Sequence, residues 1–432
     1  MRAPPWRPVS ILDEWVRREA RPISIKQLEI YGRNLTESRI INSANYVQTE
    51  LPTRLAHRIR DMQTLPYVVV ANPHISQVYE LYYKGFEAIR RIGEIENLDD
   101  NERLCKKIRE TLTEHLTTIP KLTMGILECR DLMNPEDLDK FMNTVLRSRI
   151  SRRVIAQHHL ALSHSFSTLN KSCSFDKAYM NDNVGEVFLK CNASTVIKRC
   201  MTAISTLCFA TYGTSVKIPS IQVKGHLTAT FPYILSHLEY IIGEILRNSI
   251  QGIIETHHFA EEPPPIEVTI CETPQHIKIR VSDRGGGIEP SILPYLWSFS
   301  TGPRSTQRLN NLSQVPKMAA TIQQLFVPYS SVNNTQQSDQ NGCFNNTLLA
   351  ASNNNNNNNN GFDLGSIRDL SERPSNLRLG MGLPLSKIYA EYWAGYLEIE
   401  SMEGYGVDAY LGISKLGNQN EQLTTRASID AV

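Results

Sequence analysis

The segment that most constrains how this chain can fold is residues 276–288, His-Ile-Lys-Ile-Arg-Val-Ser-Asp-Arg-Gly-Gly-Gly-Ile. Apolar and polar residues alternate up to Ser282, a period of two that predicts a half-buried strand. Asp283 follows directly, and its carboxylate can accept a hydrogen bond from an exocyclic amine such as that of adenine. Gly285 and Gly287 let the backbone approach a flat ligand closely. An ordinary surface Asp-Gly turn has the same sequence features, so this segment alone leaves both interpretations open.

A predicted helix before this strand carries two polar residues on one face. Residues 237–251 have apolar side chains at helical spacing, and Glu244 and Asn248, four residues apart, share a face. The Asn248 amide offers a neutral oxygen to Mg²⁺, and the Glu244 carboxylate can take up a proton. The alternative is that both are solvated polar residues on an amphipathic helix.

A third segment follows about a hundred residues later, where Gly380, Met381, Gly382 and Leu383 open a helical pattern that ends near Trp393. Glycine amides at the N-terminus of a helix form a ready cradle for phosphate. A lone Gly-x-Gly is also common in ordinary turns, so the order of the three segments matters more than any one of them.

Together, the three segments resemble the N, G1 and G2 boxes of the ATP-binding superfamily that includes Hsp90, gyrase B, MutL and the histidine kinases. Glu-x-x-Arg-Asn at 244–248 and the segment 401–411 narrow the resemblance further. The chain resembles the mitochondrial protein kinases of 2-oxo acid dehydrogenase complexes, the pyruvate dehydrogenase kinases and the branched-chain 2-oxo acid dehydrogenase kinase. The resemblance spans roughly residues 22–416.

The resemblance implies an ATP site and a role for several of its residues. Asn248 is expected to bind Mg²⁺, Asp283 to read adenine, and Glu244 to accept the proton of a substrate serine. Arg247 is expected to hold Glu244 or to touch phosphate. The residues expected to bind ATP are Glu244, Arg247, Asn248, Gln251, Asp283, Gly285, Gly287, Ser300, Thr301, Gly380, Met381, Gly382 and Leu383. The family's G2 box begins one glycine earlier, whereas here Arg378 and Leu379 precede Gly380, so Arg378 would supply a charge in place of a backbone contact.

The fold class expected is an N-terminal antiparallel helix bundle followed by a C-terminal α/β sandwich of the Hsp90, gyrase and histidine-kinase type. Helical periodicity near 36–62, 76–95, 101–129 and 136–166, with few strand signals, predicts the bundle, and Pro52 interrupts the first of these patterns. The expected domains are an N-terminal segment 1–22, a regulatory bundle 23–166, an ATP-binding kinase domain 192–416 with a disordered lid insertion 304–375, and a polar tail 417–432.

The second half of the chain mixes helix and strand patterns. After a polar connector at 163–190, we expect a mixed sheet backed by helices on one face. The predicted helices are 193–212, 235–257 and 383–393, and the predicted strands are 214–219, 266–271, 276–282, 395–401 and 407–413.

The segment 298–303 resembles the start of the family's ATP lid, where Ser300 and Thr301 can donate hydroxyl groups to phosphate. The sequence that follows is much longer than the usual lid. It is rich in Asn and Gln from about 333 to 360, with eight consecutive asparagines at 353–360. Such a composition cannot bury enough apolar surface to offset the entropy of ordering, which predicts disorder, with a possible short helix at 315–326.

Three further residues, His115, Arg149 and Arg153, match family positions near a regulatory pocket for small 2-oxo or halogenated carboxylates. Arginine suits bidentate carboxylate binding, although surface or interhelix salt bridges are an equally good explanation. In a two-component histidine kinase, His158 or His159 would be the phosphoacceptor. An acidic residue would then follow at once, but Leu160 stands there, which favours histidines packed in a helix interface.

Composition excludes some functional classes. The 45 basic and 44 acidic residues leave a net charge of +1, so no global field attracts nucleic acid. The eight cysteines are scattered without metal-site spacing, which is typical of reduced thiols. No apolar run is long enough to span a membrane.

The function that the resemblance implies is transfer of the ATP γ-phosphate to a serine of the E1 alpha subunit of a pyruvate or branched-chain 2-oxo acid dehydrogenase complex, which inactivates it. It also implies binding to the lipoyl domain of the E2 core, a homodimer and a location in the mitochondrial matrix. The residues after Leu416 lack the Asp-Trp motif of pyruvate dehydrogenase kinases. Two alternatives stay open, a protein-histidine kinase or ATPase on the same fold and a nucleotide-gated scaffold without catalysis.

Overall fold

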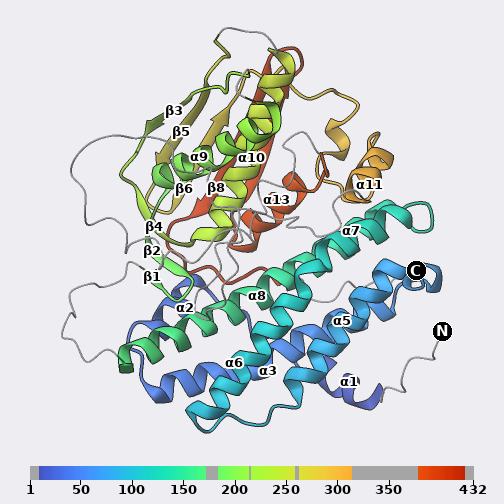
Figure 1. Cartoon of the computed structure of the whole chain (residues 1–432), viewed down its shortest axis with the longest axis vertical. Coiled ribbons are helices and arrows are strands. Elements are labelled where there is room, and N and C mark those ends of the chain that lie inside the picture. The colour runs from blue at the N-terminus through green and yellow to red at the C-terminus, as the bar shows by residue number, and fades with distance from the viewer. Residues whose placement is uncertain (1–8, 172–182, 214–215, 258–261, 314–377, 424–432) are drawn as a thin grey trace, which may run out of the picture.

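The computed structural model describes residues 9–171, 183–213, 216–257, 262–313 and 378–423. The described chain is a mixture of helices and sheets (Figure 1). Helices from the first 171 residues lie at one end of the molecule, and the sheets with their helices lie at the other. No helix within these ranges combines the length and the apolar character that crossing a membrane requires.

The N-terminal half is a helix bundle, as the periodicity predicts. Thr36, Asn72 and Asn97 each accept a backbone N–H bond at the start of a long helix, so side-chain caps define where these helices begin. The helices are α1 (Val9–Val16), α2 (Ile25–Gly32), α3 (Glu37–Gln63), α4 (Tyr67–Val70), α5 (Pro73–Arg90), α6 (Leu98–Glu114), η1 (His115–Thr117), α7 (Thr118–Glu128) and α8 (Pro135–Lys171).

The bundle differs from the sequence prediction in four places. Helix α3 runs through Pro52 without ending, so the predicted interruption is wrong. The helix predicted over 101–129 is broken by η1, because Pro120 falls in the first turn of a new helix, where a missing N–H costs little. Helix α8 extends past 166 to Lys171. The segment 1–22 contains α1, which buries Leu12 and Trp15 against the bundle and is too short to give a strong periodic signal.

The second half contains two sheets and three covering helices. The elements are β1 (Asn183–Val184), β2 (Val187–Asn192), α9 (Ala193–Tyr212), β3 (Ile221–Gly225), β4 (Thr230–Ile234), α10 (Leu235–Thr256), β5 (Ile266–Glu272), β6 (His276–Ser282), η2 (Leu293–Tyr295), α11 (Ser305–Ser313), α13 (Gly382–Tyr392), β7 (Tyr396–Met402) and β8 (Gly406–Ser414). The larger sheet has the order β3-β5-β6-β8-β7, with β3 parallel to β5 and the other pairs antiparallel.

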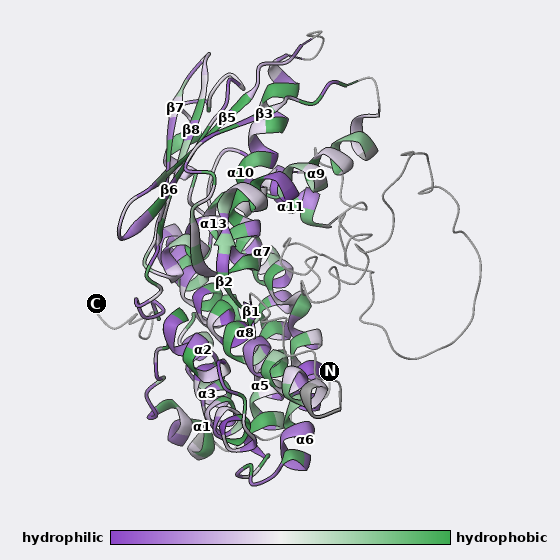
Figure 2. Cartoon of the chain, turned by 90° about the vertical axis from the view of Figure 1, so that its left-hand side faces the viewer, coloured by the Kyte–Doolittle hydropathy of each residue, from purple (hydrophilic) through white to green (hydrophobic). Residues whose placement is uncertain are grey.

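The expectation of a mixed sheet with helices on one face is confirmed. Turned by 90°, the molecule shows α10 and α13 on the same side of the large sheet (Figure 2). Along β6 the side chains of Ile277, Ile279 and Val281 are buried while Lys278 and Arg280 are exposed, which is the period of two that predicted this strand.

Four strands of this half were missed or misplaced. Residues 216–220 form no strand, so the strand predicted at 214–219 is wrong, and β3 begins at Ile221 instead. Strands β1, β2 and β4 form a small antiparallel sheet of their own. Part of this small sheet lies in the predicted connector 163–190. The sequence did not indicate it, because strands of two to six residues give too short a pattern to recognise.

Described structure extends into the predicted insertion and into the predicted polar tail. Helix α11 occupies the start of the predicted insertion 304–375. Residues 314–377, which include the predicted helix 315–326 and the asparagine run, lie outside the described residues. In the predicted polar tail 417–432, Glu421 is buried and Asn420 forms a β-bridge with Ser24 at the start of α2. Residues 424–432 lie outside the described part.

Candidate active site

A cavity of about 490 Å³ lies between α10, the turn after β6, helix α11 and the loop before α13. Ten of the predicted ATP-binding residues line it: Arg247, Asn248, Gln251, Asp283, Gly285, Gly287, Thr301, Gly380, Gly382 and Leu383. Residues more than a hundred positions apart in the sequence therefore meet around one cavity. Glu244, Ser300 and Met381 are not among its lining residues.

Asp283 stands at the end of β6 and is held there by three hydrogen bonds. Its Oδ1 accepts from the backbone N–H groups of Gly285 and Val407, at 2.9 and 3.3 Å, and its Oδ2 accepts from Ser249 Oγ at 2.6 Å. Burial raises the pKa of Asp283, and these three bonds oppose that shift. A carboxylate fixed in this way keeps lone pairs that can accept from a ligand amine.

The glycine turn after Asp283 packs against α10 without room for side chains. A Cβ atom on Gly285 would lie 2.9 Å from the backbone carbon of Gly252 on α10. Thr256 Oγ1 donates to the Gly285 carbonyl at 2.9 Å, and Gly287 has a φ of +76°, which favours glycine. The turn therefore forms a flat backbone wall next to the buried carboxylate.

Helix α10 contributes a polar face to the cavity. Glu244 is 2% exposed and forms an ion pair with Arg247 one turn later. Burial alone would lower the pKa of Arg247, but the charge and hydrogen bond of Glu244, together with Tyr240 and Cys208, outweigh burial and the pKa is raised. The half-buried Asn248 faces the cavity one residue further along, and Gln251 donates to Glu255 Oε1 at 3.0 Å.

The loop before α13 lies directly over this helix face. Gly380 has a φ of +68°, and a Cβ atom there would overlap the guanidinium of Arg308. A Cβ atom on Gly382, the first residue of α13, would overlap the Glu244 carboxylate. Both glycines are therefore required by the close approach of charged side chains. The first residues of α13 line the cavity, and the N-terminus of a helix favours negative charge.

The two hydroxyl residues at 300 and 301 have different environments. Thr301 lines the cavity, with its Oγ1 2.9 Å from Ser298 Oγ. The Ser300 side chain is fully buried, and its Oγ donates to the Pro135 carbonyl at 3.4 Å. The backbone N–H groups of Phe299 and Ser300 both donate to Asp139 Oδ1 at 2.9 Å, which turns the segment toward the bundle.

Three residues of this site were missed by sequence reasoning. Ser249 is adjacent to Asn248 and faces β6, so the helical period could have indicated it. Asp139 lies on α8 of the bundle, and Arg308 lies on α11 inside the predicted disordered segment. No local pattern connects these last two with the cavity, because both contacts cross from one part of the chain to another.

Of the predicted regulatory residues, Arg149 is buried, whereas His115 and Arg153 are half-buried. His115 Nε2 donates to the Leu81 carbonyl at 3.0 Å, and burial, helped by Arg152 and Arg149, lowers its pKa to about 3. Burial, helped by Arg153, lowers the pKa of Arg149 to about 10. Its Nη1 is a buried atom without a hydrogen-bond partner in the described part of the chain, as are both Nη atoms of Arg152. Arg153 donates to Gln157 Oε1 at 3.0 Å.

His158 and His159 are packed within the protein, as the alternative interpretation expects. The ring of His159 is 0% exposed and lies 3.0 Å from both Ser43 Oγ on α3 and Asn101 Oδ1 on α6. His158 Nδ1 accepts the backbone N–H of Glu186 at 3.3 Å. Burial lowers the pKa of both histidines, to about 3 for His158 and about 4 for His159. Neither ring is open to a nucleotide or a partner protein.

Comparison with known proteins agrees with this architecture. Residues 22–188 match a family described as mitochondrial branched-chain alpha-ketoacid dehydrogenase kinase. The chain is 30% identical over 439 residues to pyruvate dehydrogenase (acetyl-transferring) kinase 2, mitochondrial, of Saccharomyces cerevisiae, covering 98% of this chain and 86% of that protein. It is 27% identical to the mitochondrial pyruvate dehydrogenase kinase of Arabidopsis thaliana, covering 96% and 97% of the two chains.

Human pyruvate dehydrogenase kinase isozyme 4 is more distant, at 23% identity over 95% of this chain and 85% of that protein. In all three comparisons the match runs through the bundle and the cavity-bearing half alike, so it is not confined to one module. The chain therefore belongs to the mitochondrial 2-oxo acid dehydrogenase kinase family, the pyruvate dehydrogenase and branched-chain 2-oxo acid dehydrogenase kinases.

Proposed function

We propose that this chain is a mitochondrial protein serine kinase that transfers the ATP γ-phosphate to a serine of the E1 alpha subunit of a 2-oxo acid dehydrogenase complex, and so inactivates the complex. The observation that carries the proposal is the meeting of Asp283, Asn248, Gly380 and Gly382 around one cavity. We assign residues 192–416 as an ATP-binding domain of the Hsp90, gyrase and histidine-kinase type, and residues 23–166 as a regulatory bundle.

The adenine end of the cavity is assigned to Asp283 and the glycine turn. An adenine amine donates to the carboxylate, while Gly285 and Gly287 allow the ring to lie against the backbone. Ser249 holds the carboxylate in place from behind with its bond of 2.6 Å. The apolar walls of the cavity, which include Ile288 and Ile399, suit a flat ring better than a second charged group.

The phosphate end is assigned to the loop before α13. Its glycines and the helix N-terminus supply backbone amides, and the Thr301 hydroxyl lies on the opposite wall. Asn248 fits an Mg²⁺ site between them, because its half-buried side chain faces the cavity and an amide oxygen is a suitable ligand for this hard cation. Mg²⁺, when bound, neutralises charge on the phosphates.

Glu244 is assigned as the proton acceptor for the substrate serine. It lies under Gly382, at the phosphate end of the cavity, and Arg247 holds it by an ion pair. Positioning of the serine hydroxyl and electrostatic stabilisation supply most of the acceleration in phosphoryl transfer, and the base adds to them. The chain's own part is to hold the phosphates, orient the carboxylate and exclude water.

Relatives of this chain are named for action on pyruvate dehydrogenase, and the matching family description refers to the branched-chain complex. We therefore propose E1 alpha of one of these complexes as the substrate and the E2 lipoyl domain as a docking partner. We also propose a homodimer and the mitochondrial matrix as the location. These proposals rest on family membership.

The test is to incubate the purified chain with Mg-ATP labelled at the γ-phosphate and each purified E1 component. Acid-stable phosphoserine on E1 alpha supports the proposal, and it identifies which complex is the target. The matched control is Asp283→Ala, which should transfer much less label when the ATP concentration is low. Acid-labile phosphate on the chain itself would favour the histidine-kinase alternative. ATP-dependent binding of the complex without label transfer would favour the scaffold.

We further propose that the bundle binds a small carboxylate between His115, Arg149 and Arg153. Two observations favour this second function. The Arg149 guanidinium is 6% exposed with a buried nitrogen that lacks a hydrogen-bond partner among the described residues, and the guanidinium of its neighbour Arg152 is in the same state. Buried arginines with free donors are suited to an anion, because an unpaired buried charge is costly.

A further inference from the structure

Helix α11 lies between the loop before α13 and the helix bundle (Figure 1). It packs against α7, and Leu312 near its C-terminal end is 1% exposed. Gln307 and Arg308 of this helix, and Arg304 just before it, line the cavity. The helix is therefore in contact with both the bundle and the proposed ATP site.

Arg308 is the residue of α11 that reaches furthest into this junction. It is 8% exposed, and its guanidinium donates to four backbone carbonyl groups. Nη2 donates to Phe299 at 3.0 Å and to Gly380 at 3.1 Å, Nε to Leu379 at 3.3 Å, and Nη1 to Thr301 at 3.5 Å. One side chain thus ties segment 299–301 to segment 379–380.

A second residue of α11 extends this connection. Asn311, one turn after Arg308, donates from Nδ2 to the Arg378 carbonyl at 2.8 Å. Three consecutive carbonyl groups, those of Arg378, Leu379 and Gly380, are therefore bound by side chains of one helix. The absence of a Cβ on Gly380 lets Arg308 approach so closely, because a methyl group there would overlap the guanidinium.

The other end of the connection is fixed by the bundle. Asp139 on α8 accepts the backbone N–H groups of Phe299 and Ser300 at 2.9 Å, and its Oδ2 accepts from Ser298 Oγ at 2.6 Å. The Phe299 peptide group is thus bound through its N–H by Asp139 and through its carbonyl by Arg308. A chain of hydrogen bonds leads from α8 to the loop before α13.

A guanidinium has five N–H donors, and that of Arg308 already donates four hydrogen bonds to carbonyl groups. Few of its N–H groups therefore remain to bind a phosphate. We propose that Arg308 is a positioning residue, which holds the loop 378–382 so that its amides are aligned for the nucleotide phosphates. The proposal rests on the assignment of this cavity as the ATP site. Its consequence is that Arg308 affects binding of the phosphates and leaves binding of the adenosine part unchanged.

The experiment compares adenosine, ADP and ATP binding by calorimetry in the full chain and its Arg308→Lys variant. Lysine keeps the charge but cannot reach four carbonyl groups with a planar fork. We expect affinity for ADP and ATP to fall about tenfold, and affinity for adenosine to stay as in wild type. Thr306→Ala, an exposed residue on the same helix that does not line the cavity, is the matched control and should bind all three as wild type does.

Asp139→Asn supplies a second variant that keeps the side-chain shape. It weakens the acceptor for the Phe299 and Ser300 amides and should produce the same selective loss of ADP and ATP affinity, to a smaller extent. It also keeps the proposal testable if Arg308→Lys does not fold.

Equal binding of ATP by wild type and Arg308→Lys would overturn the proposal, and so would an equal loss of adenosine and ATP affinity. For Asp139→Asn, unchanged ADP and ATP affinity would do the same. A wild-type chain that binds none of the three ligands contradicts the proposed function itself, which distinguishes that failure from failure of the role given to Arg308.

Discussion

The Glu421 carboxylate accepts two hydrogen bonds from the guanidinium of Arg54, at 2.8 and 3.2 Å, which joins the C-terminal segment to helix α3 of the bundle. Its Oε1 also accepts the backbone N–H of Ile23 at 3.1 Å, and its Oε2 accepts the Tyr392 hydroxyl from α13. Burial lowers the pKa of Arg54, but Glu421, Tyr46 and Tyr392 together outweigh burial and the pKa is raised. One buried carboxylate therefore connects the bundle with a helix that backs the large sheet.

Glu421→Ala should lower the free energy of unfolding by about 3–5 kcal/mol, because removing one partner of a buried pair leaves the other charge uncompensated. Urea unfolding followed by intrinsic tryptophan fluorescence, to which the buried Trp393 next to Tyr392 contributes, would measure the change. Glu29→Ala is the control, since Glu29 pairs on the surface with the exposed Arg33 and such pairs contribute about 0–1 kcal/mol. Equal stability of the two variants would contradict the proposed connection.

Glu244→Gln should reduce turnover by ~10²–10⁴ while ATP binding is kept, because glutamine has the size of the carboxylate but cannot accept a proton. Phosphorylation of E1 alpha and calorimetric ATP titration would measure the two quantities separately. Glu239→Gln, the same change on a different face of α10, should keep most of the turnover. Unchanged phosphoryl transfer in Glu244→Gln would show that another group accepts the proton.

Asp283→Ala should weaken ATP binding by about 10–100-fold, since a hydrogen bond to a charged group contributes about 1.5–3 kcal/mol. Ser249→Ala should cause a smaller loss, because it removes only the 2.6 Å bond that orients the carboxylate. Competition of ATP with a fluorescent analogue would measure both. If Ser249→Ala had the larger effect, the adenine contact would have to lie elsewhere in the cavity.

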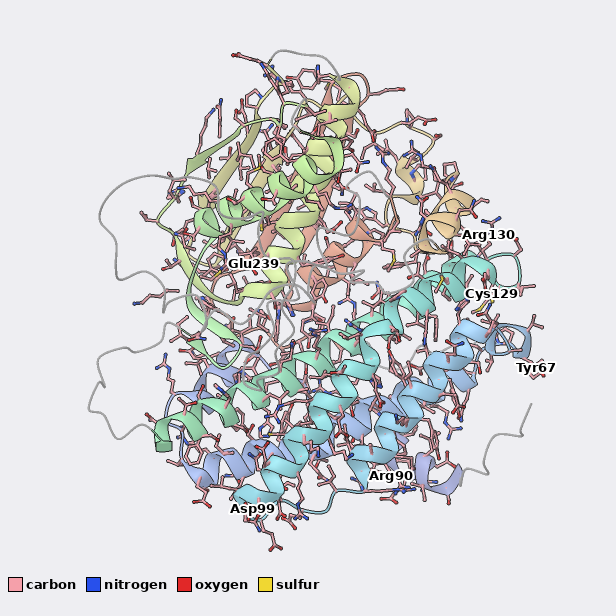
Figure 3. The ribbon with its side chains drawn as sticks, viewed as in Figure 1. Tyr67, Arg90, Asp99, Cys129, Arg130 and Glu239 are labelled. Atoms are coloured by element: carbon pink, nitrogen blue, oxygen red, sulfur yellow. The ribbon has the colours of Figure 1, made fainter. Side chains whose placement is uncertain are left out.

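Glu239 projects from α10 beside α9 (Figure 3), where it is 1% exposed and pairs with Arg199 at 3.2 Å. Burial raises the pKa of Glu239 to about 7, and Arg199 opposes that shift. A raised carboxyl pKa means that the folded protein binds a proton more readily than the unfolded chain. This contribution to stability is present at low pH and is lost as the pH rises through about 7, by up to about 1.4 kcal/mol per pH unit.

Urea unfolding of wild type and Glu239→Gln between pH 5.5 and 8 would measure this effect. The difference in stability between the two proteins should change across that range, because glutamine does not titrate. A constant difference would contradict a pKa near neutrality. His257→Gln, at the half-buried C-cap of the same helix, serves as the control for general changes in charge.

The proposed carboxylate site in the bundle predicts weak binding of a short 2-oxo acid. Calorimetry should detect heat with the wild-type chain and none with Arg149→Met, which keeps an unbranched apolar stem but removes the buried charge. Arg103→Met, at an exposed position on α6, is the control. No heat with any short 2-oxo acid, in protein that still binds ATP, would remove this second function.

Much of the cavity could be predicted because its parts are local patterns. The period of two in β6 and the helical period of α10 specify which side chains are buried and which face a ligand, and Asp283 and Asn248 follow from these patterns. Ser300, which does not line the cavity, shows the limit, because its backbone N–H donates to Asp139, 161 residues earlier, and its hydroxyl donates to the Pro135 carbonyl. A bond to a distant residue leaves no trace in the pattern around Ser300.

The sequence by itself determined the two halves of the fold, the strand that ends in Asp283, and the helix face of Glu244 and Asn248, because hydrophobic periodicity acts over a few residues. Only the tertiary structure decided that Arg308 binds the loop before α13 and that Glu421 joins Arg54 to Tyr392. These contacts depend on packing between segments tens to hundreds of residues apart. Their geometry arises when the bundle, the sheet and the C-terminal segment come together, and no single stretch of sequence encodes it.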